Sequence, residues 1–189
     1  MALILITDAT VEPVTLAQAK VQCRVDEDIT TEDDLLETLI AAARTQAEQE
    51  LSRALVTQTW ERVLDAFPES EIELGWPPII AITSVTYIDA AGDSQTLAST
   101  AYSLDTDLMP GWLLPAYGTV WPATLDTTGA VRVRFTAGYG SASDVPGAIK
   151  AWLLLKIAAL YVGGEGADHA AKMQPMVDRL LDPFKVWIA

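Results

Sequence analysis

The spacing of apolar residues changes twice along the chain, and this change limits the fold more than any other feature. From residue 16 to residue 51, apolar side chains recur every three or four positions, which is typical of amphipathic helices. From residue 56 to residue 135, short β-favouring runs separated by turn residues replace that pattern. Helical spacing returns at Pro146. The chain is therefore expected to begin and end in helices and to carry strands between them.

Neither end of the chain contains enough helices to bury its apolar stripe alone, and most helix stability comes from packing such a face. We therefore expect the two ends to pack together as one small bundle, with the β region as an insertion. The predicted fold class is α+β, with a helical bundle from both ends of the chain and an inserted antiparallel sheet or sandwich. The expected divisions are residues 1–55, 56–140 and 141–189.

The N-terminal helices carry recognisable start signals. Thr15 and Gln18 form a capping-box pattern, which predicts a helix from Leu16 to about Val25. Thr31 is expected to cap a second helix, whose acidic first turn complements the helix dipole. Cys23 lies on the apolar face of the first helix, which favours a buried small side chain over a reactive thiol. The apolar stripe of the second helix consists of Leu36, Leu39, Ile40, Ala43, Ala47 and Leu51.

The middle region contains runs that we expect to be strands. They are Val56–Leu64, Glu71–Leu74, Ile79–Asp89, Ser94–Leu97, Tyr102–Asp105, Trp112–Leu114 and Ala130–Phe135. Residues 90–93 form an expected hairpin turn. In the last run, Val131, Val133 and Phe135 alternate with arginines, which predicts one buried and one wet face. Between Ile82 and Val85 the alternation slips, which indicates either a bulge or burial on both faces.

The C-terminal region returns to helical spacing at Pro146, a residue suited to a first helical turn. Its expected apolar stripe consists of Ile149, Trp152, Leu153, Ile157 and Leu160, and it should stop at Gly163–Gly164. A further helix is expected to start at Pro175 and to stop at Pro183. Its inner face would consist of Val177, Leu180 and Leu181.

The net charge of −14 disfavours a nucleic-acid-binding surface, because affinity for phosphates rises with the number of lysines and arginines. The acidity supports solubility and repulsion from any DNA nearby. An acidic surface that serves solubility alone is an equally good interpretation. The single Cys23 indicates no disulfide. The most apolar stretch, residues 151–162, is interrupted by Lys156 and is too short to cross a bilayer, so no membrane association is expected.

No pattern in the chain predicts catalysis, metal binding or a cofactor. The acidic run from Asp26 to Glu37 imitates a calcium loop, but Thr31 stands where such a loop needs glycine. His169, the only histidine, has no converging partners, so a solvated loop histidine is favoured. The glycines at residues 163–166 follow a helix and lack the lysine of a phosphate loop. We therefore expect a protein that is not an enzyme and holds no cofactor.

Two groups of apolar residues are candidate contact surfaces. The aromatic residues Trp112, Tyr117, Trp121 and Tyr139 could stack on a glycan, but packing or a subunit interface is the favoured interpretation. The apolar C-terminal segment could fold back onto its own bundle or insert into a partner, and the sequence leaves both options open. This segment consists of Phe184, Lys185, Val186, Trp187 and Ile188.

Six segments of the chain together resemble the head-to-tail connector, or adaptor, proteins of tailed bacteriophages, in their longer form with an inserted β-domain. The resemblance covers nearly the whole chain, with the similar segments in the same order. It rests on several short sequence similarities rather than on one diagnostic motif. The segments are Pro13–Lys20, Glu32–Arg44, Arg53–Trp60, Pro115–Pro122, Phe135–Gly140 and Pro146–Lys150.

The resemblance implies a structural protein of the virion neck that is made in the host cytoplasm. Copies of it, expected to number twelve, would form a ring under the portal protein and extend the DNA channel. Genomic DNA would pass through without sequence-specific binding. The ring would offer a docking surface to the next neck or tail protein, a stopper or a tail terminator. Helices would contact neighbouring copies, and the C-terminal segment would reach the portal. The alternative function is a ligand- or glycan-binding β-module on a helical scaffold.

Overall fold

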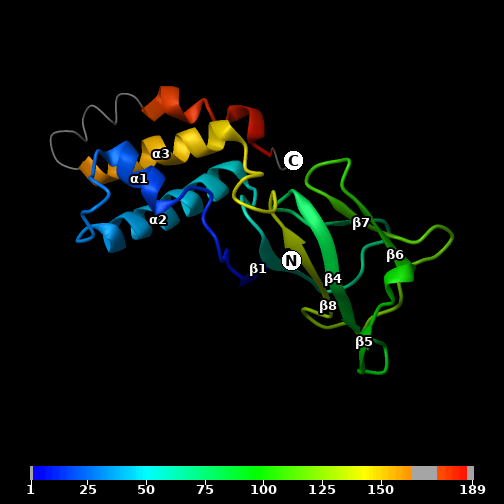
Figure 1. The fold of residues 1–189 in the computed structure, drawn as a ribbon. Helices are drawn as coiled ribbons and strands as arrows, with labels where there is room; N and C mark the ends of the chain where they lie inside the picture. Colours follow the sequence, from blue (N-terminus) through cyan, green and yellow to red (C-terminus); the bar gives the residue numbers. More distant parts are fainter. Residues whose placement is uncertain (1, 163–173, 187–189) are drawn as a thin grey trace. The chain divides into compact units, whose positions relative to one another are not determined.

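The fold was analysed in a computed structural model that describes residues 2–162 and 174–186 (Figure 1). The described chain divides into two compact units. A β unit contains residues 2–9 and 57–139, and a helical unit contains residues 10–56, 140–162 and 174–186. Each unit thus combines segments that are far apart in the sequence.

The helical unit contains α1 (Leu16–Cys23), α2 (Asp33–Leu51) and α3 (Gly147–Val162), shown in blue, light blue and yellow-orange in Figure 1. It also contains the helical residues 174–178 and the 3-10 helix η2 (Asp182–Phe184). The α3 helix packs against both α1 and α2. The expected bundle of N- and C-terminal helices is therefore confirmed.

The helix starts agree with the sequence in one case and differ in the other. The capping box at α1 is confirmed, because the Gln18 N–H donates to Thr15 Oγ1 at 3.2 Å and the Thr15 N–H donates to Gln18 Oε1 at 2.9 Å. The prediction that Thr31 caps α2 is wrong. The cap position is Glu32, and its side chain makes no capping bond. The Asp33 N–H instead donates to the backbone carbonyl of Thr30 at 3.3 Å. The helix therefore begins one residue later than predicted, and Thr31 precedes the cap position.

The core of the bundle consists largely of the two predicted stripes. Leu39 is half-buried, and the other five residues of the α2 stripe are buried. In α3, Ile149, Trp152, Leu153 and Ile157 are buried, whereas Leu160 is 45% exposed and lies outside the core, contrary to prediction. Leu181 is buried, and Val177 and Leu180 are half-buried. The predicted helix stop at Gly163–Gly164 and the His169 loop lie outside the described residues.

The β unit consists of two antiparallel sheets. The larger sheet has the strand order β1-β2-β8-β4-β5, and the smaller sheet has the order β3-β7-β6. The strands are β1 (Ala2–Thr7), β2 (Gln58–Leu64), β3 (Ile72–Glu73), β4 (Ile79–Ile88), β5 (Ser94–Thr96), β6 (Tyr102–Asp105), β7 (Trp112–Pro115) and β8 (Val131–Ala137). All seven predicted strands are present. The first strand, β1, was not predicted, because its apolar run lacks an alternating pattern.

The predicted details of the larger sheet are also confirmed. Val131, Val133 and Phe135 are fully buried, while Arg132 and Arg134 lie on the opposite, wetter face of β8. The register between β4 and β8 shifts between Ile82 and Ser84, which is the bulge that the broken alternation indicated. The hairpin between β4 and β5 turns at Gly92, whose φ is +93°.

A pair of tryptophans extends the buried face of this sheet. The ring of Trp60 in β2 stacks on the ring of Trp76, with centroids 4.7 Å apart and planes inclined by 18°. The indole N–H of Trp60 donates to Gln58 Oε1 at 3.0 Å, so its polar atom is satisfied although the side chain is buried. The apolar core of the β unit therefore continues beyond the strands into the loop that contains Trp76.

Gly111 is a glycine of the β unit that cannot be replaced without strain. Its φ is +95°, and an added Cβ would lie 2.7 Å from Ile79 Cγ1. Gly92 has a similar φ of +93°, but a Cβ there would meet nothing within 4 Å. We expect Gly111→Ala to lower the free energy of unfolding by about 2–4 kcal/mol and Gly92→Ala by about 1 kcal/mol. Urea unfolding followed by tryptophan fluorescence measures both. Equal losses would show that the contact with Ile79 carries no cost.

Candidate assembly surfaces

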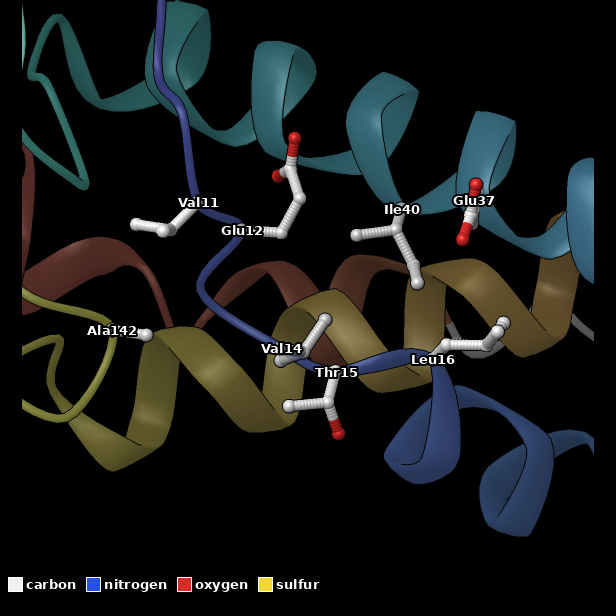
Figure 2. Close-up of a pocket in the computed structure, with 8 residues that line it drawn as sticks. All are labelled: Val11, Glu12, Val14, Thr15, Leu16, Glu37, Ile40 and Ala142. Atoms are coloured by element: carbon white, nitrogen blue, oxygen red, sulfur yellow. The ribbon is translucent and has the colours of Figure 1, made fainter.

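The helical unit contains an open groove (Figure 2). Its volume is about 560 Å³. The segment that precedes α1, one side of α2 and the loop before α3 contribute the walls. The lining residues are Val11, Glu12, Val14, Thr15, Leu16, Glu37, Ile40 and Ala142. Among the described residues that line the groove, Glu12 and Glu37 are the only ionisable ones. Most of the described lining is apolar, so the groove is suited to contact with another apolar surface.

Glu12, on the wall of the groove, belongs to a buried charge network. Arg44 Nε donates to Glu12 Oε2 at 2.9 Å, and Arg44 Nη1 donates to Glu48 Oε2 at 3.1 Å. The other carboxylate oxygen of Glu48 accepts the Leu55 N–H at 3.0 Å. Because buried charges are tolerated when they are paired and hydrogen-bonded, this network fastens the segment before α1 and the chain after α2 to the α2 helix.

The acidic run that imitates a calcium loop is organised by a lysine. Lys20 Nζ donates to the carbonyls of Glu27 at 3.1 Å and Ile29 at 2.8 Å, and it pairs with Asp33 at 2.6 Å. The Lys20 side chain is almost completely buried. An ammonium group thus binds the carbonyls of this loop. Among the described residues, no group of three or more His, Cys, Asp or Glu side chains is arranged to hold a metal ion.

Glu61 is a buried carboxylate on the open face of the larger sheet. Its Oε1 accepts a hydrogen bond from Arg132 at 2.8 Å, and its Oε2 accepts two from Arg134, at 2.8 and 3.2 Å. Burial alone would raise the pKa of Glu61, but the hydrogen bonds from Arg134 and Arg132 outweigh burial and lower the pKa below its usual value. Both arginine side chains are about half exposed. This face of the sheet therefore exposes two arginines that share the Glu61 carboxylate as their counter-ion.

The C-terminal segment begins against its own unit. Phe184 ends η2 and is half-buried, and the Lys185 ammonium pairs with Asp182 at 2.8 Å, which raises the pKa of Lys185. The Val186 N–H donates to the carbonyl of Leu51, the last residue of α2, at 3.1 Å. Trp187 and Ile188, the other two predicted members, lie outside the described residues. The described part of the segment is thus held at the C-terminal end of α2.

The four candidate interface aromatics lie in different parts of the β unit. Tyr117 is completely exposed in the loop after β7. Trp121 stacks on Phe67, with centroids 4.9 Å apart, and its indole N–H donates to the Ser70 carbonyl at 2.6 Å. Trp112 is half-buried in β7, and Tyr139 is half-buried just after β8. Only Tyr117 presents its whole ring to solvent. Sequence reasoning did not identify Phe67, the residue that covers one face of Trp121.

Several exposed apolar side chains of the β unit gather on β1. Ile4, Leu5 and Ile6 are each 40–43% exposed, although they belong to a strand of the larger sheet. The sequence analysis assigned these residues no role.

No described helix is long and apolar enough to span a lipid bilayer.

Comparisons with known proteins locate the chain among phage neck components. Residues 13–92 match the family model described as phage gp6-like head-tail connector protein. No curated protein matches the sequence.

Solved structures extend this likeness to the whole chain. A chain from the neck of an empty gene transfer agent particle, computed with C6 symmetry, matches with a TM-score of 0.82 and 25% identity. A chain from the virion of a native gene transfer agent particle matches with a TM-score of 0.81 and 26% identity. A chain from the neck of a native particle, computed with C12 symmetry, matches with a TM-score of 0.75 and 25% identity. Each match covers 100% of this chain and 97% of the other.

The Glu61 cluster makes the stability of the chain pH-dependent. Because the pKa of Glu61 is lowered in the folded state, the ionised carboxylate stabilises the fold fully at any pH above the pKa of an unfolded glutamate, about 4.3. This stabilisation is lost as the pH falls through the pKa of Glu61 in the folded state. We expect Glu61→Gln to lower the free energy of unfolding by about 1–3 kcal/mol at pH 7. The gap between wild type and variant should narrow below about pH 4.

Urea unfolding of both proteins between pH 7 and pH 3 measures this gap. Glu37→Gln is the matched control, since Glu37 is exposed, and it should change the free energy by less than about 0.5 kcal/mol. A gap between wild type and Glu61→Gln that stays constant across the pH range would contradict the role of the ionised carboxylate.

Proposed function

We propose that this chain is a head-tail connector of the phage gp6-like kind and that it completes the virion neck as a ring of copies bound under the portal. The observation that carries this proposal is the likeness of the whole chain, β unit included, to a chain of gene transfer agent necks. A structural role requires no catalytic group. We propose that the protein has no enzymatic activity and binds no cofactor.

The proposed ring contains twelve copies. Support comes from the similar neck particles, which were computed with C6 and C12 symmetry, since twelve copies satisfy both. A ring of identical chains closes through heterologous contacts, in which two different surfaces of the same chain meet. The chain therefore needs two complementary surfaces that are available in a single copy.

The proposed ring also extends the DNA channel. A net charge of −14 on each copy repels the phosphate backbone, so DNA can move past without adhering. The acidic segment before and within α2 supplies exposed carboxylates, for which the described part of the chain offers no ion-pair partner. These residues are Asp26, Glu27, Asp28, Asp34 and Glu37. The proposal is passage of DNA without recognition of its sequence.

Two docking surfaces follow from the positions of the candidate residues. We propose that Phe184, Lys185, Val186, Trp187 and Ile188 dock on the portal protein. The hydrogen bond from the Val186 N–H to the Leu51 carbonyl supports this proposal, because it holds the described part of the segment at the C-terminal end of α2. We propose that Trp112, Tyr117, Trp121 and Tyr139 contact a neighbouring copy or the next neck protein, a stopper or tail terminator. Among them, the fully exposed Tyr117 is the best anchor.

The proposed role predicts a specific assembly defect. If the gene carries an early nonsense mutation, electron microscopy of the lysate should show heads without tails beside separate, finished tails. The defect arises because the tail then has no ring on which to dock. Restoring the full-length chain from a plasmid should restore tailed particles. Intact tailed particles without this protein would overturn the neck assignment.

The portal contact can be tested separately from folding. Deleting residues 187–189 should weaken binding to purified portal protein at least about tenfold, because two large apolar side chains are removed from the contact. Tyr117→Ala also removes one large aromatic side chain, but it should leave portal binding unchanged. Surface plasmon resonance measures both affinities, and circular dichroism confirms the fold. Unaltered binding by the deletion variant would exclude the segment from the portal contact.

A further inference from the structure

The larger sheet of the β unit has two edges that differ in character. One edge is β5, which has only three residues, all of them polar and exposed. The other edge is β1, which has six residues and no charged residue or proline (Figure 1). Within the described residues, β1 pairs with β2 on one side and with no strand on the other.

An edge strand of this kind is a template for pairing, because it presents a row of unpaired backbone N–H and C=O groups. Proteins ordinarily protect such edges by keeping them short or by placing charges or proline on them. β5 is protected by its length and polarity. β1 has neither of these protections, and its one irregularity is a register shift between Leu5 and Thr7. Its large side chains Ile4, Leu5 and Ile6 are also 40–43% exposed, on both faces of the strand. The edge therefore has the features of a surface that is covered in the assembled protein.

Charge identifies the kind of partner that can cover it. Two copies of a chain with net charge −14 repel one another, so they can approach only where negative charge is scarce or reversed. β1 is uncharged throughout. In the strand register, Ile4 lies opposite Glu61, and Glu61 lies opposite Arg134. The Glu61 carboxylate is buried beneath Arg132 and Arg134 of β8, so the open face of the same sheet presents cationic groups two strands from β1.

We propose that β1 is a contact between copies in the ring, with an extended segment of the neighbouring copy adding a strand along its open edge. The proposal rests on the ring proposed above. Backbone pairing supplies affinity, as in other cases of strand addition, and Ile4 and Ile6 fill the new interface. Arg132 and Arg134 attract the carboxylates of the acidic neighbour. The contact is heterologous, since the segment that pairs with β1 differs from β1 itself, as ring closure requires.

The test is a matched pair of double variants on the two edges of the same sheet. Ile4→Lys with Ile6→Lys places two ammonium groups on β1, and Ser94→Lys with Thr96→Lys places two at the same spacing on β5. Both variants add two positive charges and so reduce the net negative charge of the chain equally. If overall charge alone controlled association, both variants would associate more strongly than wild type. Association is measured for wild type and both variants by analytical ultracentrifugation over a range of protein concentrations.

We expect the β1 variant to associate at least about tenfold more weakly than wild type, and the β5 variant to associate as well as wild type or better. If the β1 variant associates like wild type, strand addition at β1 is wrong while the ring stands. If wild type stays monomeric at every concentration, β1 is wrong as a contact that copies make by themselves, while a ring assembled on the portal stands.

Hydrogen exchange on the wild-type chain provides a measurement that does not depend on a variant folding. The backbone amides of residues 2–7 that face away from β2 should exchange quickly in dilute protein and become protected as copies assemble. Thermal unfolding of each variant at low concentration checks the monomer fold. If the amides of β1 exchange equally fast in the monomer and in the assembled form, the proposal is overturned.

Discussion

Most of this structure depends on the pairing of β2 with β8. These strands carry the chain into and out of the β unit, and they pair over their full length, from Gln58 opposite Ala137 to Leu64 opposite Val131. The points of entry and exit therefore lie side by side. Because of this, α3, which begins ten residues after β8, can pack against α1 and α2, which precede β2. A bundle made from the two ends of the chain is compatible with a long insertion only when the insertion returns to its starting point.

Paired charges hold the segments around this framework in place. Arg44 links the segment before α1 and the chain after α2 to the α2 helix, and Lys20 gathers the acidic loop between α1 and α2. Arg44, Glu48 and Lys20 are buried beside partners that satisfy them, so removal of one partner would leave a buried charge without compensation. These clusters have the chemistry of structural ion pairs, in which each cation is matched by carboxylates or by backbone carbonyls.

The local elements could be predicted from the sequence because they depend on spacing and on caps. The period of apolar residues located α2, α3 and the seven predicted strands, and the broken alternation near Val85 located a real bulge. The failures concern interactions that are distant in sequence. β1 is a strand because β2 lies beside it, and Trp121 is engaged because Phe67 covers it. Leu160 fits a helical stripe but is 45% exposed, so helical spacing alone did not identify which residues of α3 are buried. The candidate aromatic residues could be identified from the sequence, but local sequence could not predict that they lie in different parts of the β unit.

A ring of acidic copies around DNA has two opposing electrostatic requirements. The channel benefits from carboxylates that repel phosphate, whereas the contacts between copies require that the same carboxylates do not repel the neighbouring chain. In the proposed ring, the chain resolves this by separating the two kinds of surface along its sequence. The exposed carboxylates of residues 26–37 belong to the helical unit, while an uncharged strand and two arginines share one sheet of the β unit. Because Glu61 is buried under those arginines, it holds them in position and contributes little negative charge to the surface. A strongly acidic chain can thus retain a surface on which another copy of itself can bind.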